Sequence, residues 1–84
     1  MSVYVDKMRL CIKSRQWPYH SACHMIADHP RELDAIASEI GLQLGWRQRD
    51  HYDLTTNKRR LAVEAGAIEL EDKEFMAKLG RRNG

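Results

Sequence analysis

The chain has 84 residues, the size of one small domain, so a tandem architecture is excluded. Its 43% of hydrophobic and 31% of charged residues also exclude a disordered or collagen-like chain. The formal net charge of +2 is too small for nucleic-acid binding to be the default function, although residues 7–15 and 58–60 are locally basic.

No apolar run approaches the roughly 18 residues of a membrane-spanning helix, and the first residues lack the basic and then hydrophobic pattern of a secretion signal. We therefore expect a cytoplasmic protein with no membrane partner, folded as one domain over 1–84 with a flexible basic tail from about residue 80. A chain this short buries only about 60% of the surface that its unfolded form exposes, so we also expect a homo-oligomer.

Alternating apolar residues from Val3 predict a strand that is interrupted near residues 6–7. A Trp-Pro pair predicts a loop over residues 16–21, because proline disfavours the helical conformation in the residue before it. The mostly apolar run 22–27 then predicts a buried strand.

A 3.6-residue apolar periodicity predicts a helix over 29–41. Pro30 suits its first turn, where a missing N–H group has no cost, and Asp28 or His29 precedes it as a cap. Gly41 follows as a residue that ends a helix in the left-handed conformation.

In the second half of the chain, segments with the apolar pattern of a strand alternate with segments that have the pattern of a helix. We expect a short strand over 51–54, a helix from Thr55 or Thr56 to Gly66, a strand over 67–70 and a last helix from Asp72 to Gly80. This order predicts a small α/β sandwich with about three helices and a short, at least partly parallel sheet.

Several short motifs make the chain similar to a known family. They are Tyr4-Val5-Asp6 with Met8-Arg9, Cys23-His24-Met25-Ile26-Ala27-Asp28, Glu32-Leu33 with Ile40-Gly41, Trp46 with Gln48, His51-Tyr52-Asp53, and Lys58-Arg59 through Ala62-Val63 to Gly66-Ala67. On these residues the chain resembles an uncharacterised family of short bacterial and phage proteins, a domain of unknown function. The resemblance implies a bacterial or phage source and a compact α/β fold, but no activity. The segment Lys13 to Ser21 is more irregular than in the family, which leaves its role open.

Three aspartates stand at the ends of predicted strands: Asp6, Asp28 and Asp53. Ligands of open α/β sheets gather outside the carboxyl ends of parallel strands, so these aspartates converge if the strands are parallel and adjacent. His24 precedes Asp28, and His51 lies two residues before Asp53, on the same face of a strand.

We interpret His24, His51 and Asp53 as candidate catalytic residues, because an imidazole titrates near neutral pH and a carboxylate can orient its ring. The candidate ligand-binding residues are Asp6, Asp28, Tyr52, Lys58 and Arg59. Of these residues, Lys58 or Arg59 would hold an anionic oxygen of the ligand. Alternatively, the three aspartates bind Mg²⁺ for phosphodiester or nucleotide hydrolysis, and the cofactor is otherwise open.

Each candidate also has a purely structural interpretation. Aspartates commonly cap helices, and a histidine among apolar residues is more often a core residue whose hydrogen bonds are made within the protein. Four further side chains are eligible to bind zinc: Cys11, His20, Cys23 and His24. They lack the two close pairs of a structural zinc site, so zinc is disfavoured and both thiols are expected in the core. Trp17, Tyr19 and Trp46 either stack on a base or, more often, pack in the core or against a subunit.

Two functions are compatible with these candidates. The first is a module that binds a phosphate-bearing ligand, a nucleotide or nucleic acid, with phosphoesterase activity as its reaction. The second is a non-catalytic, oligomeric interaction protein that acts on a host or bacterial protein and whose polar residues only cap helices. The chain has no glycine-rich phosphate loop and no hydrolase motif, so whether it is an enzyme stays open.

Overall fold

The computed structural model describes residues 2–82, and side chains as far as residue 79. Its helices are α1 (Pro30–Glu39), α2 (Thr56–Glu64) and α3 (Asp72–Arg82), with a 3₁₀ turn, η1, over Leu44–Trp46. Its strands are β1 (Val3–Val5), β2 (Arg9–Leu10), β3 (Ser21–Ala27), β4 (Tyr52–Leu54) and β5 (Ile68–Glu69). Within the described residues, no helix is both long and apolar enough to cross a membrane.

The longest strand, β3, is the centre of the sheet. It pairs antiparallel with β4 along one edge and with β1 and β2 along the other, and β1 pairs parallel with β5. The chain therefore has the predicted α/β fold with a partly parallel sheet. The parallel relation does not extend to the strands around the candidate site, because β3 runs antiparallel to β1, β2 and β4.

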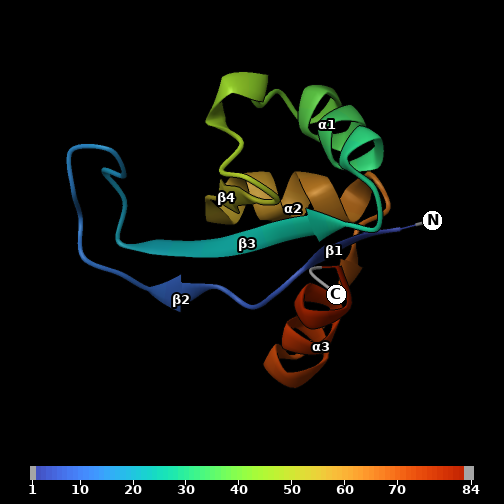
Figure 1. Ribbon diagram of the computed structural model, residues 1–84. Coiled ribbons are helices and arrows are strands. Elements are labelled where there is room, and N and C mark those ends of the chain that lie inside the picture. Colours follow the sequence, from blue (N-terminus) through green and yellow to red (C-terminus); the bar gives the residue numbers. More distant parts are fainter. Residues whose placement is uncertain (1, 83–84) are drawn as a thin grey trace.

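Helices α1 and α2 lie on one face of the sheet and α3 lies on the other (Figure 1), and apolar side chains are buried on both faces. Met25 and Leu54 belong to the larger cluster under α1 and α2, and Ile26 packs with Phe75 of α3. Because side chains alternate along a strand, His24 projects on the same face as Ile26. The candidate site therefore lies on the face that α3 covers only in part.

Most helix ends follow the predicted local rules. The hydroxyl of Thr55 accepts a hydrogen bond from the backbone N–H of Lys58 at 3.2 Å, so Thr55 caps α2. Gly41 and Gly66 have φ angles of 87° and 113°, which side chains rarely tolerate, and they follow α1 and α2 as expected.

Two details predicted at helix ends are wrong, the side-chain cap before α1 and the stop at Gly80. His29 occupies the N-cap position of α1 without a side-chain hydrogen bond, and the Asp28 carboxylate instead accepts hydrogen bonds from the backbone of Ser2 and the hydroxyl of Tyr4. Gly80 does not end the last helix, because α3 continues to Arg82. A single glycine costs a helix only about 1 kcal/mol, which its neighbours can offset. Residues 83–84 of the expected tail lie outside the described residues.

The loop between β2 and β3 projects away from the rest of the domain (Figure 1). Trp17 anchors its base, since Nε1 donates a hydrogen bond to the carbonyl of Ser21 at 3.1 Å. Leu10 and Ile12 are 91% and 92% exposed at the start of the loop. The loop thus presents two aliphatic side chains to solvent.

Candidate functional site

A β-bulge brings Asp6 next to His24. Val5 pairs with Met25, and Arg9 pairs with Ala22. Between these two pairs the N-terminal segment has one residue more than β3, which is the mark of a bulge. Asp6 lies in this bulge and is only 2% exposed. Its Oδ2 is 2.9 Å from Nδ1 of His24, and its Oδ1 accepts the backbone N–H of His24 at 2.6 Å. Since a carboxylate only accepts, Nδ1 of His24 carries a proton, and Nε2 faces away from Asp6.

Arg59 from α2 holds the same bulge from the opposite side. Its Nε donates to the backbone carbonyl of Asp6 at 2.8 Å, and one of its terminal nitrogens forms an ion pair of 2.9 Å with Glu69 of β5. The guanidinium is therefore engaged in positioning Asp6, which differs from the predicted role in holding a ligand anion.

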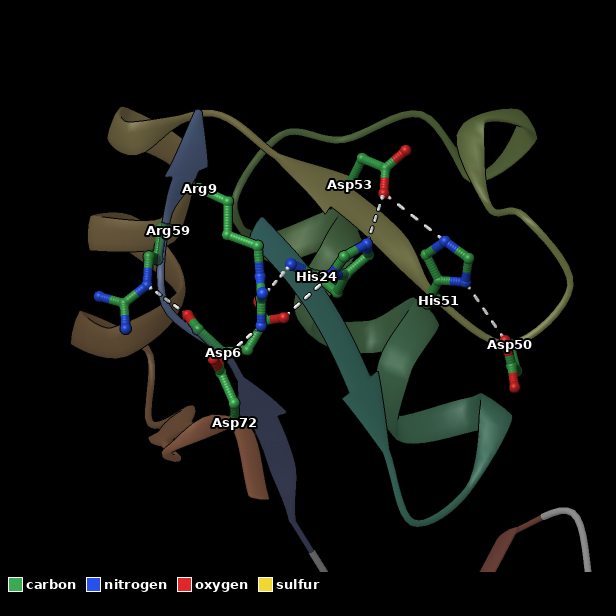
Figure 2. A network of polar contacts seen from close by, with 8 residues as sticks. All are labelled: Asp6, Arg9, His24, Asp50, His51, Asp53, Arg59 and Asp72. Carbon is green, nitrogen blue, oxygen red and sulfur yellow. Dashed lines mark hydrogen bonds and ion pairs between the residues drawn. The ribbon is translucent and has the colours of Figure 1, made fainter. Parts of the chain in front are cut away.

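Strand β4 adds the second half of the site, because Asp53 pairs with His24 across the sheet. Oδ1 of Asp53 lies 3.9 Å from Nε2 of His24 and 3.5 Å from Nε2 of His51. The two imidazole rings meet edge to face, with their centroids 5.4 Å apart. Figure 2 shows both rings directed at this one carboxylate, so the expected convergence of His24, His51 and Asp53 is present.

Each of these three side chains is also held by a further polar contact. Nδ1 of His24 bonds to Asp6, and Nδ1 of His51 lies 3.3 Å from Oδ1 of Asp50. Oδ2 of Asp53 accepts a hydrogen bond from the amide of Gln48 at 2.8 Å. The atoms that face the centre of the cluster are therefore oriented by contacts on the outside.

Solvent reaches the cluster through two pockets that meet at His24. One has a volume of about 530 Å³ and is lined by Asp6, His51 and Phe75 among others, and the other, of about 320 Å³, includes Asp53. Arg9 lines both pockets. The side chains of His24, His51 and Asp53 are 44%, 27% and 26% exposed, so a small ligand can reach them.

A third pocket, which we call the aromatic groove, approaches Asp53 from the loop side. It has a volume of about 550 Å³, and its lining includes Trp17, Tyr19, Trp46, Arg47, Asp53 and Lys58. Of the predicted aromatic residues, Tyr19 and Trp46 are about half exposed rather than buried in the core. Aromatic and basic side chains thus adjoin the histidine and aspartate cluster.

The Asp6 and His24 pair shifts both pKa values. Burial raises the pKa of Asp6, but the hydrogen bonds from the side chain and backbone of His24 together outweigh burial and hold that pKa below its usual value. The same side-chain hydrogen bond raises the pKa of His24, against the opposing effect of burial. The contact therefore favours a carboxylate facing an imidazolium.

Three predicted ligand-binding residues lie apart from the cluster. Asp28 follows β3 and lies at the opposite end of the β1–β3 pair from Asp6, because these two strands are antiparallel. Tyr52 projects to the other face of the sheet, where its hydroxyl donates to Asp34 at 3.0 Å. Nζ of Lys58 donates to the carbonyl of Ile40 at 2.8 Å, although the side chain also lines the aromatic groove.

The residues predicted from the sequence to bind a metal do not come together in the structure. Asp6, Asp28 and Asp53 do not gather as magnesium ligands, and Cys23 is buried in the core while Cys11 is half-buried in the loop. Among the described residues, the one group of three eligible ligands is His24, His51 and Asp53, whose ligand atoms lie within 4.8 Å of one another.

Sequence patterns did not indicate three further residues of the site, Asp50, Gln48 and Arg9. Asp50 and Gln48 belong to the turn before β4, where an isolated bridge pairs Gln48 with His51. A turn has no side-chain periodicity, so the only available signal was the proximity of both residues to His51. Arg9 forms an ion pair of 2.6 Å with Asp72 of α3, a contact that depends on the tertiary fold.

The fold and the site together define a small α/β protein with a solvent-open cluster of two histidines and an aspartate. The chain belongs to the family described as protein of unknown function (DUF4031), whose sequence model matches residues 3–82. No curated protein and no solved structure gave a significant match.

Proposed function

We propose that this protein is a small cytoplasmic module of bacterial or phage origin that binds a phosphate-bearing ligand at His24, His51 and Asp53. The observation that carries the proposal is that Nε2 of both histidines faces one oxygen of Asp53, at 3.9 and 3.5 Å, where solvent pockets open. Helix caps and core histidines have no need to face one another in solvent, so this arrangement favours a ligand site.

A nucleotide or a single strand of nucleic acid is the ligand that suits the surroundings best. Trp17, Tyr19 and Trp46 line the aromatic groove beside Asp53, and stacking on aromatic rings contributes about 1–3 kcal/mol per base. Arg47 lines the groove and Arg9 lines the pockets at His24, where guanidinium groups suit phosphate oxygens. Each also forms an ion pair, Arg47 with Asp34 and Arg9 with Asp72, which a phosphate group would share.

Phosphoester hydrolysis is the reaction that these groups fit. A water molecule attacks phosphorus and loses a proton, the bond from phosphorus to the leaving oxygen breaks, and that oxygen takes up a proton. Two imidazoles and a carboxylate serve these steps either as proton donors and acceptors or as ligands of a metal that activates the water. Both uses require the three side chains at one point.

Adenosine monophosphate and a short oligothymidylate test the proposal, with tryptophan fluorescence as the readout of binding. We expect His51→Gln and Asp53→Asn to weaken binding at least tenfold while the circular dichroism spectrum stays that of the wild type. His29→Gln is the matched control, because His29 is exposed and makes no side-chain cap bond. Equal binding by all variants would show that the cluster is not the ligand site, and unfolding of both site variants would favour a structural role.

A second candidate function, oligomeric interaction, is favoured by the exposed start of the β2–β3 loop. β2 lies at an edge of the sheet, and its last residue, Leu10, is almost fully exposed, as is Ile12 just after it. An open strand edge with apolar side chains is a template for pairing with another chain. We propose that a second copy of the protein covers this edge, in keeping with the small core of an 84-residue chain, and that the oligomer contacts a host or bacterial protein.

Sedimentation equilibrium tests the proposed pairing of two copies. The wild type should form a dimer, and the double variant with Leu10→Ser and Ile12→Ser should be a folded monomer. Leu44→Ser is the control, because Leu44 is also exposed but lies in η1, away from β2. A monomeric wild type, or a double variant that dimerises equally well, contradicts this second candidate.

A further inference from the structure

We infer that His24, His51 and Asp53 form a binding site for a divalent transition-metal ion. A bound cation would supply the positive charge that a phosphate group needs, and this link to phosphate rests on the proposed function. Metal binding itself is measured without any phosphate ligand, so the two proposals can fail separately.

The distances between the ligand atoms are close to those of a metal site. Nitrogen and oxygen ligands about 2.0–2.1 Å from a tetrahedral ion lie about 3.3 Å from each other. Oδ1 of Asp53 is 3.5 Å from Nε2 of His51 and 3.9 Å from Nε2 of His24. Both separations are longer than hydrogen bonds, and the three ligand atoms all lie within 4.8 Å of one another, so an ion would draw the three side chains closer together.

The contacts on the outside of the cluster are those that orient metal ligands. Metal-binding histidines usually donate their second ring N–H group to a carboxylate or carbonyl oxygen, which fixes the ring and its tautomer. His24 has this contact to Asp6 and His51 has it to Asp50, so both present Nε2 to the centre. Gln48 holds the remaining oxygen of Asp53 in the same way. All three ligands are therefore positioned before an ion arrives.

The local charge also favours a cation. The carboxylates of Asp6, Asp50 and Asp53 surround the two imidazoles. Two nearby arginines form ion pairs with other acids, Arg9 with Asp72 and Arg59 with Glu69. A divalent ion that replaces the proton on Nε2 of His24 would lie beside the carboxylate of Asp53 and close to that of Asp6.

The ligand set selects the class of ion. Imidazole suits Zn²⁺, Fe²⁺, Co²⁺ and Ni²⁺, whereas Mg²⁺ prefers oxygen ligands and water. Two imidazoles and one carboxylate on one side leave coordination positions open toward the pockets at His24. A water molecule or a phosphate oxygen can occupy these positions.

Calorimetric titration of EDTA-treated protein with Zn²⁺, and visible absorption with Co²⁺, test the inference directly. We expect one equivalent to bind, with an intense visible Co²⁺ spectrum of low coordination number. His51→Gln and Asp53→Asn should each weaken binding at least tenfold, and the His29→Gln control should match the wild type. Asp50→Ala should weaken it by about 10–100-fold through the orientation of His51, with partial recovery in Asp50→Asn.

The inference is overturned if the wild type shows no saturable binding at one equivalent, or if His29→Gln weakens binding as much as His51→Gln. Circular dichroism of His51→Gln and Asp53→Asn guards against unfolding, and neither residue is part of the buried Asp6 contact. Normal Zn²⁺ binding without binding of adenosine monophosphate would support the metal site and contradict only the proposed function. Equal nucleotide binding in EDTA would contradict the metal's role in holding phosphate.

Discussion

Asp6 is almost inaccessible to solvent, and both of its carboxylate oxygens bond to His24. We predict that this pair makes the stability of the metal-free protein depend on pH. The lowered pKa of Asp6 contributes stability above its unfolded value of about 3.9, which is lost as the pH falls through the folded pKa. The raised pKa of His24 contributes stability below its unfolded value of about 6.5, which is lost as the pH rises through the folded pKa.

The pair should therefore stabilise the fold most between about pH 4 and pH 6.5. Urea unfolding in EDTA, measured below, within and above this range, gives the free energy of unfolding at each pH. His24→Gln should flatten the decline on the alkaline side, whereas His29→Gln should keep it. A wild-type profile that rises steadily through neutral pH would contradict the assignment.

The two cysteines should differ in reactivity. Burial raises the pKa of the Cys23 thiol to about 12, whereas Cys11 is half-buried in the β2–β3 loop. The thiolate is the reactive form, so iodoacetamide at about pH 8 should modify Cys11 and leave Cys23 intact in the folded protein. Mass spectrometry of peptides after a short reaction measures both. Modification of Cys23 as fast as of Cys11 would mean that β3 is not a buried central strand.

At this scale, the sequence predicted the pair of His51 and Asp53, because residues two apart on a strand share a face. It also indicated His24 and Asp6 as site residues, but not their contact. The contact between Asp6 and His24 depends on the extra residue in the bulge and on the register of the N-terminal segment against β3. No local sequence pattern predicts either feature.

Among the elements, α2 carries Arg59 to the bulge, so its first turn matters to the site. Thr55→Ala removes the hydroxyl that accepts the N–H group of Lys58, and it should lower the free energy of unfolding by about 1 kcal/mol. Thr55→Ser should retain most of the stability, because serine caps equally well. Urea unfolding of both variants measures the difference. If Thr55→Ser loses as much as Thr55→Ala, the hydroxyl does not act as a cap.

Helices and strand faces were largely predictable from apolar periodicity and from turn residues such as Gly41 and Gly66. The direction of neighbouring strands was not. The apolar run 22–27 predicted a buried strand, but the strands that pair with β3 are set by contacts far apart in the chain. Asp28 was consequently expected beside Asp6, although the antiparallel pairing of β1 and β3 separates them.

For the whole molecule, a metal that binds only the folded state should raise thermal stability. At one hundred times the dissociation constant the gain is about 2.7 kcal/mol. In a domain of this size, that corresponds to an increase in Tm of about 10 °C or more. Calorimetric melting with and without Zn²⁺ should show this increase for the wild type and for His29→Gln. Asp53→Asn, which should bind the ion at least tenfold more weakly, should show at most about half of this increase at the same Zn²⁺ concentration. An equal increase in that variant would place the ion elsewhere.

The central claim is that His24 and His51 form one site with Asp53, although they come from distant parts of the chain. The chain has four histidines, so His20 and His29 serve as internal controls. Side-chain NMR spectra during a Zn²⁺ titration of the EDTA-treated protein follow all four rings at once. The signals of His24 and His51 should change together and be complete at one equivalent, with those of His20 and His29 unchanged. Separate responses of His24 and His51, or a first response from His20 or His29, would contradict the claim.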